Sequence, residues 1–134
     1  MKRALAITLS GCAIAALGLV GSAGAASAAC VKTNLTTGEE KQGTTVNISS
    51  NSTCNDLNLT RADDKSTDWD EYAGFYFKES TDQWIRGSRG YIYADDFNAS
   101  SSSGWKVLLS DINNGTKVSV ASRYDGGDSV TVAH

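Results

Sequence analysis

The sequence predicts an all-β protein, specifically an antiparallel β-sandwich of seven or eight strands with an immunoglobulin-like architecture. Three runs at 107–109, 118–120 and 130–132 carry an apolar residue at every second position, as strands with one buried face do. Turn-forming residues separate these runs, namely Asn-Asn-Gly at 113–115 and Asp-Gly-Gly-Asp at 125–128. We therefore expect two successive β-hairpins, and no segment longer than a turn has the spacing of an amphipathic helix.

Earlier segments of the chain show the same strand-like alternation. They lie at 45–49, 56–60, 71–78, 83–86 and 91–94. Leu57 and Leu59 are expected to point into the core, and the turn residues at 80–82 predict a third hairpin between their flanking strands. Tryptophans near strand starts are expected to fill the core: Trp69, Trp84 and Trp105.

The first 28 residues have the pattern of a secretory signal peptide. Lys2 and Arg3 precede an apolar body at 5–20, and Ala-Ser-Ala at 26–28 resembles a cleavage signal. The apolar body, about 16 residues, is shorter than the roughly 20 that a membrane span needs. We expect residues 29–134 to form a single β-sandwich domain that is secreted, extracellular and free of the membrane after signal removal.

Two cysteines remain after the predicted cleavage, Cys30 and Cys54. In an oxidising compartment they predict one disulfide, which would stabilise the fold by roughly 3 kcal/mol in the chain-entropy model. The competing interpretation is a lipid-modified cysteine at position 30, as in bacterial lipoproteins. Such signals favour a large aliphatic residue where this chain has Ser27.

The charge of the chain argues against nucleic acid as a partner. Without Lys2 and Arg3, the 12 basic residues fall to ten against 15 acidic residues, which leaves a net charge of −5. Nucleic-acid binding depends on basic residues that neutralise phosphates. We therefore expect a partner other than DNA or RNA.

Catalytic groups are scarce in this sequence. Its single histidine is His134, the last residue, and chain ends usually fray. Acid-base and nucleophilic catalysis near neutral pH usually depend on a histidine or on a tuned carboxylate or cysteine. We expect no enzymatic activity and no cofactor, the alternative being an enzyme whose acid-base pair consists of aspartates.

Aspartates are concentrated in the connector at 62–70 and at 95–96. The connector contains Asp63, Asp64, Asp68 and Asp70. Calcium is bound by six to eight oxygen ligands, which clustered carboxylates supply. Because no EF-hand spacing is present, a solvated acidic loop is the favoured interpretation, and no metal site is expected.

A patch of tyrosine and arginine is the candidate binding surface. If Phe75, Phe77 and Ile92 face the core, neighbouring positions on the same strands face solvent. The candidate binding residues are Tyr72, Tyr76, Tyr91, Tyr93, Arg86 and Arg89. Tyr and Arg are enriched where proteins bind one another. The alternative is that cross-strand tyrosine pairs only stabilise an outer sheet face.

The alanine-rich signal, the single early disulfide and the small β-rich body resemble secreted actinobacterial proteins, such as the adaptor subunits of umbrella toxin particles. The resemblance implies a non-enzymatic adaptor that links lectin subunits to a large scaffold protein, and it assigns no role to any residue. We expect a protein-binding module with a secreted or cell-surface protein as partner. The alternatives are a carbohydrate-binding, lectin-like module with a glycan partner and a secreted enzyme inhibitor. Such inhibitors usually have two disulfides and a proline-bearing loop.

Overall fold

The computed structural model describes residues 30–50 and 54–134. The predicted signal peptide, 1–28, lies outside the described residues. Within them, no helix has the length and apolarity that crossing a membrane requires.

The described part of the chain is an all-β sandwich, as predicted, with eleven strands rather than seven or eight. The number is larger because no strand was predicted at β1, and because β2 and β8 are additional pairings of only two residues each. The strands are β1 (Lys32–Thr36), β2 (Gly38–Glu39), β3 (Thr45–Asn47), β4 (Leu57–Asp63), β5 (Trp69–Lys78), β6 (Gln83–Arg86), β7 (Ile92–Asp95), β8 (Phe97–Asn98), β9 (Lys106–Leu109), β10 (Lys117–Ser122) and β11 (Ser129–Ala133). Two short 3₁₀ turns are η1 (Glu79–Thr81) and η2 (Ser102–Gly104).

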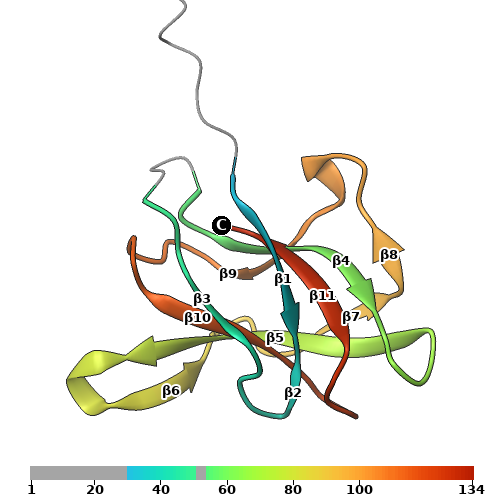
Figure 1. The fold of residues 1–134 in the computed structure, drawn as a ribbon, viewed down its shortest axis with the longest axis horizontal. Coiled ribbons are helices and arrows are strands. Elements are labelled where there is room, and N and C mark those ends of the chain that lie inside the picture. The colour runs from blue at the N-terminus through green and yellow to red at the C-terminus, as the bar shows by residue number, and fades with distance from the viewer. Residues whose placement is uncertain (1–29, 51–53) are drawn as a thin grey trace, which may run out of the picture.

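The strands form two sheets. In the first sheet β11 lies between β1 and β4, and β4 also pairs with β8 and β9. In the second sheet β10 and β5 are the central strands; β2 and β3 pair with β10, and β6 and β7 pair with β5. Figure 1 shows β4 and β8 of the first sheet above β5 and β6 of the second. All described pairings are antiparallel except that of β2 with β10.

The three alternating runs near the end of the chain are strands β9, β10 and β11, but they do not pair with one another. Strand β9 pairs with β4, β10 pairs with β5, and β11 pairs with β1 and β4. The two predicted hairpins are therefore wrong. The chain crosses from the first sheet to the second after β9 and returns after β10.

The turn residues between β9 and β10 form a turn without forming a hairpin. The Thr116 amide donates to the Asn113 carbonyl at 3.1 Å, and Gly115 has the positive φ of 83° expected of glycine in a turn. The flanking backbone bonds to other segments, however: the Ile112 amide donates to Asn55 and the Ile48 amide to Thr116. These contacts direct the chain across the sandwich. The third predicted hairpin, β5 with β6, is confirmed.

The core lies between the two sheets and contains the apolar residues at alternate strand positions. Leu57 and Leu59 are fully buried, as predicted. The other fully or almost fully buried core residues are Leu35, Ile48, Ala62, Tyr72, Ala94, Leu108, Leu109, Val118, Val120, Val130 and Val132. Because both sheets contribute branched aliphatic side chains, the hydrophobic effect holds the two layers together.

Strand β5 faces the core with the side opposite to the predicted one. Tyr72 is fully buried and Tyr76 packs against the core, so the predicted outward orientation of both tyrosines is wrong. Phe75 and Phe77 alternate with them and lie on the outer side of the sheet. The reason is Gly74: a Cβ there would lie 2.6 Å from Leu109 Cγ, so the glycine side of β5 is the one that accommodates the opposite sheet.

The predicted disulfide between Cys30 and Cys54 is present, with Cα atoms 5.5 Å apart. It spans a sequence separation of 24 residues that includes β1, β2 and β3. The bond attaches the first strand to the segment that leads into β4.

His134 is held in place, contrary to the prediction that it would fray. It is buried and exchanges two backbone hydrogen bonds with Val31, at 2.9 and 3.0 Å. Its ring Nδ1 accepts from the Ser49 amide at 3.2 Å, and Nε2 lies 2.9 Å from Thr33 Oγ1. An accepting Nδ1 means that the imidazole is neutral, and burial lowers the pKa of His134.

This neutral histidine predicts a loss of stability in mild acid. A histidine with a lowered folded pKa stabilises the fold above its unfolded pKa near 6.5, and this contribution is lost as the pH falls through the folded pKa. We expect the unfolding midpoint of the wild-type protein in urea to fall more between pH 7 and pH 5 than that of His134→Asn, whose amide does not titrate. Parallel pH profiles for the two proteins would contradict this role.

Candidate functional site

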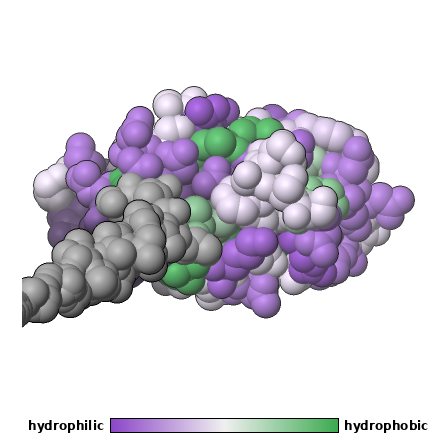
Figure 2. Space-filling view, turned by 90° about the horizontal axis from the view of Figure 1, so that it is seen from above, coloured by the Kyte–Doolittle hydropathy of each residue, from purple (hydrophilic) through white to green (hydrophobic). Residues whose placement is uncertain are grey.

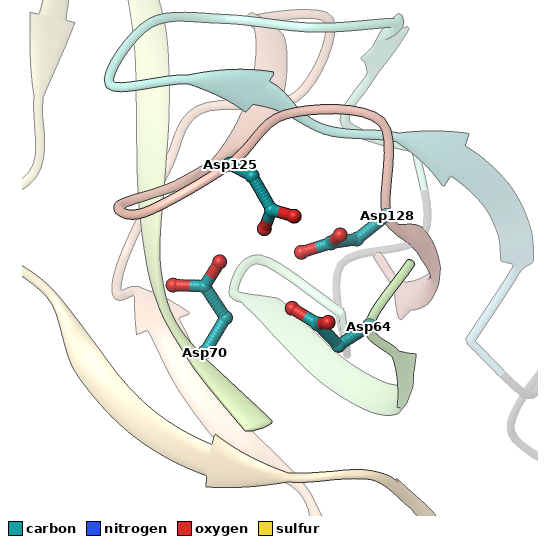
Figure 3. Close-up of side chains that lie close together, drawn as sticks. All are labelled: Asp64, Asp70, Asp125 and Asp128. Carbon is teal, nitrogen blue, oxygen red and sulfur yellow. The ribbon is translucent and has the colours of Figure 1, made fainter. Parts of the chain in front are cut away.

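Four aspartates converge at one end of the sandwich; we call them the aspartate cluster. Asp64 follows β4, Asp70 is the second residue of β5, and Asp125 and Asp128 lie in the loop from β10 to β11. One carboxylate oxygen from each lies within 4.8 Å of the others. Figure 3 shows the four side chains pointing toward a common centre.

Backbone amides fix one oxygen of each buried carboxylate. Asp64 Oδ1 accepts from the amides of residues 66 and 67 immediately after it. Asp70 Oδ1 accepts from the Glu71 amide at 2.6 Å and from the amides of residues 123 and 124 at 3.2 Å. These bonds tie the aspartates to the loops around them and set the orientation of each carboxylate.

Asp128 and Asp125 complete the cluster from the other loop. Asp128 Oδ1 accepts from the Lys65 amide at 3.0 Å, and Asp125 Oδ2 accepts from the Ser66 hydroxyl. Asp64, Asp70 and Asp128 are 7, 0 and 0% exposed, and among the described residues no hydrogen-bond donor reaches their Oδ2 atoms. Each of these three carboxylates therefore has one bonded oxygen and one free oxygen.

The surroundings shift the pKa values of these groups in different directions. Burial raises the pKa of Asp128 to about 6, with a further increase from the negative charge of Asp64. Burial also raises the pKa of Asp70. For Asp64, burial acts upward, but hydrogen bonds from residues 66 and 67 leave its pKa lowered. Asp128 is thus the member whose ionisation the site disfavours most clearly.

Tyr72 extends under the cluster from β5. Its side chain is fully buried, and its hydroxyl interacts with the Asp128 carboxylate without reaching the geometry of a full hydrogen bond. Burial raises its pKa, and the charges of the nearby Asp128, Asp64 and Asp70 raise it further.

Three exposed aromatic side chains lie beside the aspartate cluster; we call them the aromatic cluster. They are Trp69, Tyr93 and Tyr124, which are 40, 52 and 55% exposed. The Trp69 ring stacks on Tyr93 with centroids 5.5 Å apart and meets Tyr124 edge-on at 5.4 Å. The Tyr93 hydroxyl donates to Asp95 at 2.6 Å. Mutual contact restrains the three rings while it leaves much of their surface open to solvent.

A surface cavity of about 260 Å³ connects the two clusters. Its lining consists of Asp64, Ser66, Thr67, Trp69, Asp70, Tyr124 and Asp125. Acidic residues therefore form part of the lining, and two aromatic residues, Trp69 and Tyr124, form another part. Such a surface offers a charged group and an apolar group to the same ligand.

The structure separates the predicted binding residues. Tyr72 and Tyr76 lie on the core side, and Tyr93 belongs to the aromatic cluster. Tyr91 is half-buried, and the guanidinium groups of Arg86 and Arg123 lie over its ring at 5.3 and 5.7 Å. Arg89 donates to Ser110. Of the predicted surface patch, Tyr91 and Arg86 remain together on the outer side of the second sheet.

The acidic connector is also only partly as predicted. Asp64 and Asp70 are buried in the cluster, whereas Asp63 and Asp68 are exposed. Asp96 accepts from the Asp64 amide at 2.8 Å, so it supports the connector from outside the cluster. The solvated-loop interpretation is therefore wrong for Asp64 and Asp70, because the loop from β10 to β11 packs over them.

Sequence reasoning missed Asp125, Asp128, Trp69 and Tyr124. The sequence marks the two aspartates only as turn residues. It predicts Trp69 in the core, but the side chain is 40% exposed, so that prediction is wrong. The sequence did contain a signal for a functional site here: the turn at 125–128 begins and ends with an aspartate and directly follows an aromatic residue.

Comparison with known proteins found no relatives. No protein-family model matches the chain. No curated protein matches it. No solved structure matches it.

Proposed function

We propose that this chain is a secreted, non-enzymatic binding module that attaches to another extracellular protein through the aromatic cluster. The observation that carries the proposal is the set of three mutually contacting rings that remain 40 to 55% exposed. Exposed apolar surface is costly to leave in water, and a contiguous group of rings is typical of a binding surface. Trp and Tyr are also the residues most enriched among binding hot spots.

The aromatic cluster is suited to binding because its rings are already held in place. A side chain that binds must give up rotational freedom, at about 0.5–1.5 kcal/mol for each one immobilised. Trp69 contacts both tyrosines, and Tyr93 is held further by its hydrogen bond to Asp95. Part of this entropy is thus lost before a partner arrives, which favours affinity.

Charged groups around the rings supply the polar rim of an interface. The Arg123 guanidinium lies 5.6 Å from the centre of the Tyr124 ring and pairs with Glu71 at 2.7 Å. A polar rim around an apolar centre is the usual organisation of protein interfaces. On the face drawn in Figure 2, hydrophobic atoms form small separate areas among hydrophilic ones. We infer that a few aromatic anchors, rather than a broad apolar surface, carry the binding.

The size of the cavity favours a protein partner over a small molecule. At about 260 Å³ it is smaller than the roughly 300–1,000 Å³ usual for small-molecule sites. A shallow depression of this kind accommodates a protruding side chain of a partner. We propose that this chain is a bacterial adaptor in an extracellular assembly, such as a toxin complex, with another secreted or cell-surface protein as partner.

The second candidate is a carbohydrate-binding module that uses the same cluster. The cavity lining places carboxylate oxygens beside the rings of Trp69 and Tyr124. A sugar presents hydroxyl groups at its edge and C–H groups on its face, so it could bond to the carboxylates and stack on a ring. This arrangement favours a glycan as the alternative ligand.

The binding proposal predicts a large effect of the double variant Trp69→Ala, Tyr124→Ala. We expect it to weaken partner binding by about 2 kcal/mol or more, as for aromatic hot spots, because both anchors are lost. Stability should change little, since the rings are exposed. The measurement is titration against the protein that the wild-type chain retains from the secreted fraction of its source culture.

The matched control is Trp84→Ala. Trp84 is a half-buried tryptophan of β6 that contacts Phe77, at the end of β5 away from Trp69. It should bind like the wild type. If Trp84→Ala weakens binding as much as the double variant does, the aromatic cluster is not the binding surface. Retention of the chain on an insoluble polysaccharide, with loss in the double variant and no protein partner, would replace the adaptor proposal with the carbohydrate-binding one.

A further inference from the structure

The aspartate cluster concentrates negative charge where the described part of the chain supplies no ionic partner. The ion pairs of the described residues join Arg61 to Asp63 and Arg123 to Glu71, and none of them includes a cluster aspartate. The Lys65 side chain donates to the Gly126 carbonyl at 3.2 Å rather than to a carboxylate. Buried carboxylates without a counter-charge are unfavourable, both because water is excluded and because like charges repel.

Unsatisfied buried atoms give a second indication of a ligand. The Oδ2 atoms of Asp64, Asp70 and Asp128 accept no full hydrogen bond within the described residues, and the fully buried Tyr72 hydroxyl beside Asp128 forms none either. Buried polar groups in native proteins are nearly always paired, so each exception requires an explanation. Here four exceptions occur around one point, toward which the cluster carboxylates are turned in Figure 3.

The hydrogen bonds of the cluster have the pattern of an outer ligand shell. In each buried aspartate, backbone amides hold one oxygen and leave the other without a full hydrogen bond. Metal sites orient their ligands in this way, with a second set of groups that fixes each ligand. Two loops distant in sequence, 64–70 and 123–128, contribute both the carboxylates and the amides that orient them.

The spacing and the chemistry of the oxygens suit calcium. Calcium binds oxygen at about 2.3–2.6 Å, so ligands on opposite sides of it lie about 4.6–5.2 Å apart. Magnesium binds at about 2.0–2.1 Å, which limits opposite ligands to about 4.2 Å. The cluster oxygens lie within 4.8 Å of one another, a spacing that a calcium ion can bridge.

We propose that the aspartate cluster is a calcium site in which Asp64, Asp70, Asp125 and Asp128 each supply a carboxylate oxygen. Four carboxylates fall short of the six to eight oxygens that calcium prefers. The cavity lined by Asp64, Asp70 and Asp125 admits water to provide the rest. A bound cation offsets the repulsion among the carboxylates and connects the β4–β5 connector to the β10–β11 loop.

The proposal predicts that the purified protein, after removal of divalent ions by EDTA, binds one calcium ion per chain in a calorimetric titration with CaCl₂. Calcium should raise the thermal unfolding midpoint, since a ligand that binds only the folded state stabilises it. Magnesium at the same concentration should have a much smaller effect. No heat of binding and no change in the midpoint at millimolar calcium would overturn the proposal.

The decisive variant is Asp128→Asn, which keeps the shape of the side chain and removes its charge. We expect calcium affinity to fall by at least about tenfold, the lower end of what even outer-shell changes cost. Stability without calcium should be maintained or should increase, because a buried charge is lost. Asp125→Asn, at a half-buried position, tests the same loss should Asp128→Asn fail to fold.

The matched control is Asp68→Asn, which makes the same charge change at an exposed residue of the same connector. It should bind calcium like the wild type. Equal loss of affinity in Asp68→Asn and Asp128→Asn would show that the cation responds only to net charge, which contradicts a site at the cluster.

Terbium provides an independent measurement, because it occupies calcium sites and emits when a nearby tryptophan is excited. Trp69 lines the same cavity as three of the aspartates. We expect terbium emission that calcium abolishes and that Trp69→Phe reduces strongly, whereas Trp84→Phe leaves it unchanged. Emission that survives in Trp69→Phe at full strength would place the cation elsewhere.

Discussion

Replacing Tyr72 with alanine is expected to lower the free energy of unfolding by about 4 kcal/mol, because a fully buried ring leaves a cavity between the sheets. The same substitution at Tyr93, which is 52% exposed, should cost less than about 1 kcal/mol. The measurement is the urea midpoint and slope of each variant. Equal losses in the two variants would contradict the placement of Tyr72 in the core.

Tyr72→Phe separates the ring from its hydroxyl. Since the hydroxyl forms no full hydrogen bond within the described residues, its removal should leave stability unchanged or raise it slightly. A loss as large as that of the alanine variant would mean that the hydroxyl, rather than the packing of the ring, stabilises the fold.

The orientation of β5 shows what alternation leaves undetermined. A period of two divides the strand into two sets of residues, but it does not say which set is buried. Here the set with Phe75 and Phe77 is the more apolar, yet the set with Tyr72 and Gly74 faces the core. The deciding factor is the fit of Leu109 against Gly74, a contact between sheets that the local sequence does not reveal.

The pairing of β9, β10 and β11 was undetermined for a similar reason. Alternation located the three strands correctly, and Val118, Val120, Val130 and Val132 are all fully buried as predicted. The turn between β9 and β10 fixes only local backbone angles. The partner of each strand depends on segments far away in sequence, such as β4 and β5, so the hairpin prediction was wrong while the all-β prediction was confirmed.

Only two of the four members of the aspartate cluster lie in the connector that the sequence identifies as acidic. Asp64 and Asp70 lie six residues apart in one acidic connector, for which the sequence favours a solvated loop over a calcium site. Asp125 and Asp128 are about sixty residues further along, and they join the cluster through long-range bonds such as that from the Lys65 amide to Asp128. Asp125 and Asp128 both belong to a turn and contribute carboxylates to the cluster. The local sequence indicates the turn but not the cluster.

The disulfide was predictable because only two cysteines remain after the predicted signal peptide, and its removal is expected to have the second-largest effect. The double variant Cys30→Ser, Cys54→Ser should lose about 3 kcal/mol, since the bond closes a loop with a sequence separation of 24 residues and thereby limits the unfolded chain. The measurement is the unfolding midpoint in urea, with the far-ultraviolet circular dichroism spectrum as a check on the fold.

The fold itself should survive in this variant, because β1 keeps its pairing with β11 and the backbone bonds between Val31 and His134. The central pairings β4–β11 and β5–β10 contain neither cysteine. The wild-type protein reduced with dithiothreitol is the control, and it should match the double variant. If the double variant is as stable as the oxidised wild type, the bond does not limit the unfolded chain, and β1 is held by its strand pairing and by the contacts of His134.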